Sequence, residues 1–203
     1  MGTGGGRPAR VAVYDGKRGN VLAQFAALGG KAVAVRVAGG DVDGDGYADV
    51  TTANGAGMRS TVEVYGGKRL VDGAAAAQAR LAAFAVSATP GKPAGLNSVY
   101  VAAADMTGDG KAEIVATFDG SPTAAILDGL SGRVISTTNL GPSFARGATV
   151  AARAGRIMVG TVAGAAPAVR VLGYANLVWT VGVVQPPKLP GIAATNRLGI
   201  FVG

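Results

Sequence analysis

The chain of 203 residues is long enough for one domain with a sizeable hydrophobic core. It contains no cysteine and no histidine, which excludes disulfide bonds, thiol nucleophiles, histidine-based catalysis and Cys/His metal sites, so any bound metal would need oxygen ligands. The net charge is +7, yet seven of the 12 acidic residues lie in two nine-residue windows, 41–49 and 105–113. The basic excess would suit an anionic partner. The chain has no dense run of Lys and Arg, however, so its sequence does not predict nucleic-acid binding.

Short strands dominate the predicted structure, because the chain is 49% apolar but only 5% aromatic and contains 34 glycines. Residues 1–9 predict a flexible tail that lacks the apolar stretch of a signal peptide. After it, an apolar strand that ends in a glycine-containing turn recurs at 11–16, 62–67, 124–129 and 169–174. A second strand follows each turn, most clearly at 20–25, 133–137 and 177–184, as expected for hairpins.

Two further strands precede each of the last three hairpins, at 32–39 and 48–53, 98–104 and 112–118, and 147–153 and 156–162. The repeating unit is therefore a four-stranded, up-and-down antiparallel sheet. Sheets of this kind in tandem are typical of the blades of a β-propeller, so we predict an all-β propeller fold.

The two ends of the chain complement each other. Residues 10–28 supply only the last two strands of a unit, whereas 192–203 resembles 150–160, which supplies the first two. We therefore predict a single domain at 10–203 with four blades, in which the terminal strands share one blade. The predicted parts are a half blade at 10–30, blades at about 31–90, 91–141 and 142–187, and a half blade at 188–203. The alternatives are a fragment of a larger propeller and a half-ring completed by a second copy.

One segment departs from the rhythm. Residues 68–97 are longer than their counterparts and contain an alanine-rich stretch. A helix that starts at Ala74 with Asp72 as its N-cap is one interpretation, and a strand at 80–86 is the other. Propensity alone leaves both open.

The first acidic window predicts a calcium site. Asp41, Asp43, Asp45 and Asp49 occupy positions 1, 3, 5 and 9 of a glycine-containing loop, and the carbonyl of Tyr47 would supply an oxygen at position 7. Calcium takes six to eight oxygen ligands, and carboxylates this close would repel one another without a cation. EF-hands have such loops too, but they are flanked by helices, whereas the flanks here predict strands.

The second acidic window repeats this pattern with fewer charges. Asp105, Thr107 and Asp109 stand at positions 1, 3 and 5, the carbonyl of Lys111 stands at position 7, and Glu113 stands at position 9. We therefore expect a second, weaker calcium site.

The stretch from Gly40 to Val50, followed by Asn54–Gly57 and Val62–Tyr65, resembles an FG-GAP (VCBS-like, integrin α-type) repeat, and 105–115 followed by 124–129 resembles another. The resemblance implies a calcium-binding loop between the first two strands of a blade, held by the residues named above. It also implies a propeller of six to eight blades, of which this chain would then be a half or a fragment.

The resemblance further implies a calcium-stabilised binding or scaffold module of the adhesion type, outside the cell or at its surface, without catalysis. A lectin-like module is the alternative, although most of its candidate aromatic residues stand at strand positions typical of a core: Tyr14, Tyr47, Tyr65, Tyr100, Tyr174 and Trp179. A polysaccharide-acting enzyme is less favoured, because the clustered carboxylates are assigned to calcium and Glu63 is expected at the surface. The apolar stretch 171–184 is too short for a membrane span.

Overall fold

The computed structural model describes residues 10–30, 34–89, 91–175 and 178–182. Within these ranges the chain forms one two-stranded and three four-stranded antiparallel sheets. Their strands are β1 (Arg10–Tyr14) and β2 (Val21–Ala26); β3 (Val35–Gly40), β4 (Asp49–Asn54), β5 (Thr61–Tyr65) and β6 (Arg80–Ala85); β7 (Val99–Ala104), β8 (Glu113–Phe118), β9 (Thr123–Leu127) and β10 (Val134–Asn139); and β11 (Ala148–Arg153), β12 (Arg156–Thr161), β13 (Val169–Ala175) and β14 (Val178–Gly182).

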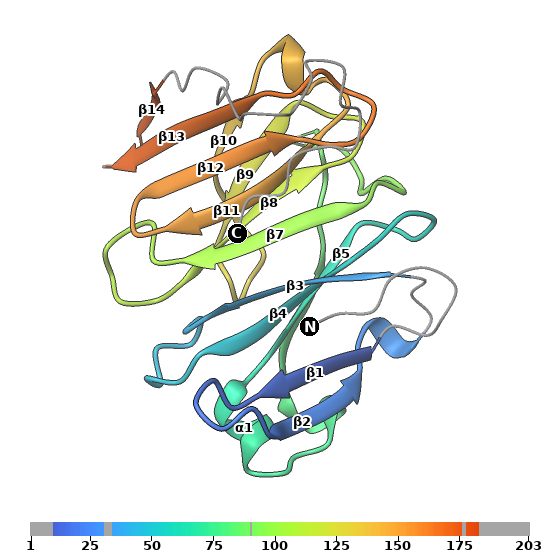
Figure 1. Cartoon of the computed structure of the whole chain (residues 1–203), viewed down its shortest axis with the longest axis vertical. Helices are drawn as coiled ribbons and strands as arrows, with labels where there is room; N and C mark the ends of the chain where they lie inside the picture. The colour runs from blue at the N-terminus through green and yellow to red at the C-terminus, as the bar shows by residue number, and fades with distance from the viewer. Residues whose placement is uncertain (1–9, 31–33, 90, 176–177, 183–203) are drawn as a thin grey trace.

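Each four-stranded sheet follows the chain in order, so consecutive strands are neighbours throughout. Within the described ranges, the strands predicted from the sequence are confirmed to within a few residues. The first strands of the three sheets, β3, β7 and β11, lie side by side and run in the same direction (Figure 1). Packed four-stranded meanders with adjacent first strands have the arrangement of β-propeller blades, so the all-β, propeller-like prediction is confirmed at that level.

The described strands do not form a closed ring. Figure 1 shows the β1–β2 hairpin and the sheet that ends with β14 at opposite ends of the longest axis of the molecule. The predicted tail at 1–9 and the predicted half blade at 188–203 belong to the part of the chain outside the described ranges, as do residues 183–187. The blade count and the blade boundaries therefore stay predictions.

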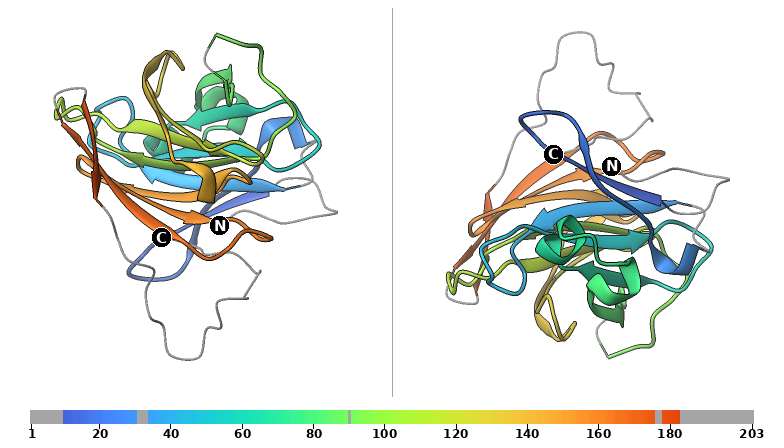
Figure 2. Two further views of the ribbon diagram at one scale, coloured as in Figure 1. Left: turned by 90° about the horizontal axis from the view of Figure 1, so that it is seen from above. Right: turned by 90° about the horizontal axis from the view of Figure 1, so that it is seen from below.

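The irregular segment contains both of the elements that the sequence left open. It forms two short helices, α1 (Gly67–Val71) and α2 (Ala76–Ala79), and then strand β6. Asp72 is not the N-cap of a helix at Ala74. It is the C-cap of α1, and its carboxylate accepts a hydrogen bond from Lys68 at 2.6 Å. The two helices contact each other, α1 lies beside β2 and β4, and both stand at the periphery of the molecule (Figure 2). No helix among the described residues is long and apolar enough to cross a membrane.

Among the described residues, three apolar clusters fill the spaces between successive sheets. The largest side chains among them, such as Phe118, Ile126 and Leu172, are almost completely buried. Glycine is needed where backbones approach each other: a Cβ on Gly147 would lie 2.5 Å from the carbonyl oxygen of Phe118. Small residues therefore allow the sheets to pack closely, which compensates for the small number of aromatic residues in the core.

Glu63 is not a surface residue, contrary to the expectation from its isolated position in a strand. It is only 6% exposed, on the face of β5 that meets the β1–β2 hairpin and its following turn. Its carboxylate accepts hydrogen bonds from the backbone N–H of Leu28 at 2.7 Å, from the Tyr65 hydroxyl, and from Arg80 at 3.2 Å. Leu28 has a positive φ of 53°, so the carboxylate also holds the backbone in an uncommon conformation. This sheet tolerates a buried carboxylate because three donors satisfy its oxygens.

We predict that Glu63→Ala lowers the free energy of unfolding by about 2–4 kcal/mol, because it leaves the buried N–H of Leu28 and the Tyr65 hydroxyl without an acceptor. Urea denaturation measures the change. The matched control is Asp72→Ala, which removes the carboxylate of the exposed pair with Lys68 and should change stability little. Equal effects of the two substitutions would contradict the assignment of Glu63 as a buried anchor.

Candidate metal centre

The two acidic loops lie at the same edge of neighbouring sheets. The first joins β3 to β4 and the second joins β7 to β8, and because β3 and β7 run in parallel, their turns meet (Figure 1). Each loop has two glycines with positive φ, at 81° and 85° for Gly44 and Gly46, and at 84° and 87° for Gly108 and Gly110. These left-handed positions allow the chain to wrap tightly around its own carboxylates.

Backbone N–H groups of the first loop point at its carboxylates. Asp41 accepts hydrogen bonds from the N–H groups of Gly44 at 2.7 Å and Gly46 at 2.8 Å. The N–H of Asp45 lies 3.2 Å from a carboxylate oxygen of Asp43. These N–H groups hold the acidic side chains inside the loop, where their remaining oxygen lone pairs could bind a cation.

Asp49 anchors the loop to the sheet. It is 1% exposed, and its two carboxylate oxygens accept hydrogen bonds from the N–H of Val42 at 2.8 Å and the N–H of Gly67 at 2.9 Å. Burial raises the pKa of this carboxyl above its ordinary value, the two N–H donors lower it, and the nearby charge of Asp43 raises it further. A cation beside Asp49 would favour its charged form and offset the cost of burial.

Asp41, Asp43 and Asp49 converge. One carboxylate oxygen from each lies within 4.8 Å of the others. Oxygens bound to one calcium ion at about 2.4 Å are at most about 4.8 Å apart, so the three fit a shared calcium ion, and hard oxygen donors are the ligands that calcium prefers. Asp45, also predicted as a ligand, is not part of this group; it is exposed and accepts a hydrogen bond from the N–H of Tyr47 at 2.8 Å.

The second loop repeats the hydrogen-bond pattern of the first. Asp105 accepts from the N–H groups of Gly108 and Gly110, at 2.6 and 3.0 Å, and Asp109 accepts from the N–H of Lys111 at 2.9 Å. The two loops are therefore equivalent elements of two repeats.

Position 3 distinguishes the loops. In the second loop Thr107 stands where the first has Asp43, and its hydroxyl donates to Glu113 at 3.1 Å. Glu113 also accepts from the N–H of Met106 at 2.7 Å, and burial raises the pKa of its carboxyl. Among the described residues, only the first loop brings three carboxylates this close together.

The two acidic loops also contact each other. The residue spacing within either loop could not predict this contact. The N–H of Ala112, in the second loop, donates to the carbonyl oxygen of Asp41 at 2.6 Å. Val42 is 2% exposed and belongs to the same apolar cluster as Ala112. The side chain of Lys111 lies against Gly44, where a Cβ would be 3.1 Å from its Cε. An ion that orders the first loop would therefore act on the second loop as well.

Two residues that position this centre were missed in the sequence. Gly67 donates to Asp49 and cannot hold a Cβ, which would lie 1.9 Å from the carbonyl oxygen of Ala48. Gly129, in the β9–β10 turn, packs against Val42. Both glycines belong to turns that the sequence predicted, a Gly-Gly and an Asp-Gly turn. Their contacts, however, are with residues far away in the sequence, so no pattern in the neighbouring residues could predict them.

The aromatic residues do not form a common surface. Tyr65 and Tyr174 are buried, and Tyr100 is half-buried under Arg36, whose guanidinium lies 4.6 Å from the ring centroid. Tyr14 and Tyr47 are exposed, in different hairpins. Trp179 packs edge-on against Tyr174, and its indole N–H donates to the hydroxyl of Ser136 at 2.8 Å.

Comparison with known proteins identifies the first repeat. Residues 33–71, which include the first acidic loop, match the FG-GAP repeat family, so the resemblance is confirmed for this segment. No curated protein matches the chain.

Solved structures with a similar fold include three rhamnogalacturonan lyases, each with a TM-score of 0.51. They are lyase PL11 of Bacillus licheniformis (15% identity, 93% of this chain and 44% of the lyase covered), lyase YesW (14%, 94% and 38%) and the exotype lyase YesX (14%, 94% and 37%). The chain thus spans less than half of each lyase, and identities this low show a shared fold only.

We predict that Gly129→Ala destabilises the protein by about 1–3 kcal/mol, because its Cβ would lie 2.4 Å from a methyl group of Val42 and 3.0 Å from the carbonyl oxygen of Ala112. The same Asp-Gly turn in the β1–β2 hairpin provides the matched control. A Cβ on Gly16 would meet nothing within 4 Å beyond its chain neighbours, so Gly16→Ala should cost less than about 0.5 kcal/mol. Thermal denaturation of both variants measures the difference, and indistinguishable midpoints would contradict the contact between this turn and the first loop.

Proposed function

We propose that the chain is a calcium-stabilised, propeller-type binding module of the adhesion or scaffold class that performs no catalysis of its own. The observation that carries this proposal is the convergence of Asp41, Asp43 and Asp49 in a loop that matches the FG-GAP repeat. Calcium would bind the three carboxylates, with Asp45 and the carbonyl of Tyr47 as further candidate ligands from the same loop.

Calcium in this role is structural. It would neutralise like charges at the edge where the two acidic loops meet, and through Asp41 and Ala112 it would stabilise the contact between the second and third sheets. Asp105, Asp109 and Glu113, with the hydroxyl of Thr107, would form the weaker second site. Extracellular calcium concentrations suffice even for weak sites of this type, which supports a place outside the cell or at its surface.

The remaining candidate groups for acid–base chemistry support a non-catalytic role. Glu63, the buried carboxylate outside the loops, is occupied by the N–H of Leu28, by Tyr65 and by Arg80. Burial raises the pKa of the Tyr65 hydroxyl, and its hydrogen bond to Glu63 raises it further. A tyrosine with a raised pKa is a poor general base at neutral pH.

A second candidate function is the binding or cleavage of an acidic polysaccharide, favoured by the shared fold with three rhamnogalacturonan lyases. Incubation of the protein with rhamnogalacturonan separates the two. Cleavage by a lyase generates an unsaturated uronate, which absorbs in the ultraviolet. Turnover above the buffer background would contradict the non-catalytic proposal, and binding without turnover would identify a lectin-like module.

We predict that isothermal titration of the metal-free protein with calcium detects a stronger and a weaker site, and that Asp43→Asn weakens the stronger site by about tenfold or more. Asp43 is the suitable probe because, in the part of the chain that the structure describes, its carboxylate accepts only the N–H of Asp45, so the amide removes charge with little structural loss. Asp15→Asn, in the β1–β2 turn away from both loops, is the control that should leave calcium binding unchanged, because its exposed carboxylate accepts only N–H groups of its own turn among the described residues. Absence of calcium uptake by the unmodified protein would overturn the proposal.

We infer further that residues 192–203 complete the sheet of which the structure describes β1 and β2, as the pattern of the three other sheets suggests. Sedimentation velocity in calcium should then show a monomer of 19.9 kDa. A dimer would instead indicate half-rings that complete each other, and would contradict closure within one chain.

A further inference from the structure

The acidic residues are concentrated at one edge of the sheets, where basic residues accompany them. The acidic residues lie in or beside the turns that join β1–β2, β3–β4, β5–β6, β7–β8 and β9–β10, with two exceptions, Glu63 within β5 and Asp119 after β8. The described connections at the opposite edge carry Arg59, Lys92 and Arg146, all exposed. In the described connections of this second edge, the basic residues outnumber the one acidic residue, Asp119. The edge is therefore positively charged and would attract anions locally.

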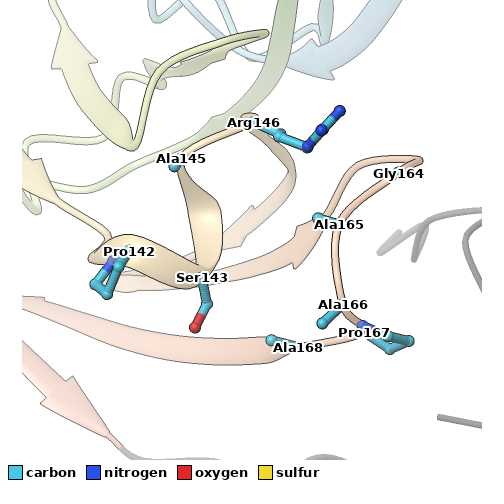
Figure 3. A pocket seen from close by; sticks show the side chains of 9 residues that line it. All are labelled: Pro142, Ser143, Ala145, Arg146, Gly164, Ala165, Ala166, Pro167 and Ala168. Carbon is cyan, nitrogen blue, oxygen red and sulfur yellow. The ribbon is translucent and has the colours of Figure 1, made fainter. Parts of the chain in front are cut away.

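A cavity of about 410 Å³ opens at the basic edge. One wall is the short helical turn η2 (Pro142–Phe144), which precedes β11, and the other is the turn between β12 and β13, from Gly164 to Ala168 (Figure 3). The volume is in the range of small-molecule sites, which is about 300–1,000 Å³. The two walls come from separate connections of the chain, so only the folded sheet creates this cavity.

Arg146 supplies the charge of the cavity. Its guanidinium extends over the β12–β13 turn, where a Cβ on Gly164 would lie 3.3 Å from Nη1 (Figure 3). Neither of the ion pairs found in the described part of the chain includes Arg146. Asp119, the acidic residue that follows β8 at this edge, belongs to neither pair, and the pKa of the Tyr100 hydroxyl is raised by burial and also by the charge of this carboxylate. The guanidinium is thus available to a ligand.

The wall that carries Ser143 is held in place by a different arginine. Arg170 donates a hydrogen bond to the carbonyl oxygen of Leu140, and its guanidinium lies 5.5 Å from the centroid of the Phe144 ring. Ser143 is exposed and lines the cavity, and in Figure 3 its hydroxyl points towards the β13 side, away from the Arg146 guanidinium. Arg170 therefore positions the wall, while Arg146 and Ser143 present polar groups to the cavity.

The chemistry of the lining selects among anions. Besides Ser143 and Arg146 it consists of alanine, glycine and proline, without an aromatic ring on which a nucleobase could stack and without the long aliphatic side chains that would hold a lipid. The lining offers no ring on which a sugar could stack either, so a saccharide would be held here by polar contacts, above all by pairing of a carboxylate with the guanidinium through two parallel hydrogen bonds.

We propose that this cavity binds the carboxylate of an acidic saccharide, with Arg146 paired to the carboxylate and Ser143 bonded to a neighbouring sugar oxygen. The proposal rests on the binding-module function and gives it a ligand class and a site. It places that site at the edge opposite the calcium loops, so the metal is not part of ligand recognition.

The test is isothermal titration of the full-length protein, in calcium and moderate salt, with tetragalacturonate and with a neutral galactotetraose. We expect the acidic saccharide to bind and the neutral one not to bind. Arg146→Gln should lower the affinity for tetragalacturonate by about tenfold or more, since a charge-assisted pair is lost. Arg59→Gln, the matched control, removes the same charge from another turn of the same edge and should lower it less than about twofold.

Several outcomes would overturn the proposal. Equal losses in the two variants would indicate diffuse attraction to the basic edge, and equal binding of the neutral saccharide would exclude a carboxylate site. Competition by an oligonucleotide at the same concentration would show that the site binds anions in general.

Repetition of the titration in EDTA separates this proposal from the calcium function. Binding that depends on Arg146 but not on calcium supports the cavity even if no calcium is taken up, whereas calcium uptake without an effect of Arg146→Gln removes the cavity alone.

Discussion

Carboxylates that accept backbone N–H groups hold this protein together at the points where strand pairing ends. Asp49 and Glu113 do this at the bases of the two acidic loops, and Glu63 does it between the first hairpin and the second sheet. Each case buries a charged group, which is costly unless its hydrogen bonds are satisfied. The N–H donors come from turns that the sheets leave unpaired, so one interaction satisfies both partners.

This constraint explains why the acidic residues are few and clustered. A chain with little aromatic volume gains its packing from close contact between sheets of valine, alanine and glycine. Such contact brings the loops of neighbouring sheets together, as Ala112 and Asp41 show, and so brings their carboxylates together too. The repulsion between the loops is the physical reason why a cation would stabilise this edge, and close packing is the reason why its effect would reach beyond one loop.

The sequence was informative where the structure is local. The alternation of strands, the Asp-Gly turns and the spacing of Asp41, Asp43 and Asp49 are properties of short windows, and they predicted the sheets and the acidic cluster. It was misleading at Glu63, because burial there depends on Leu28, 35 residues away. It was silent on the cavity beside Arg146, since two connections from different hairpins form it. The number of blades also depends on contacts between distant strands, and periodicity alone does not determine it.

The position of Trp179 has a consequence for spectroscopy. It is the only tryptophan in the chain, and its indole bridges the last sheet to Ser136 of the third. Its fluorescence therefore reports the contact between these two sheets, whereas the acidic loop that matches the FG-GAP family lies in the second. A change in emission on addition of calcium would show that binding at the acidic loops alters the packing of the last two sheets, and an unchanged emission would show that the effect of the metal does not extend to this contact.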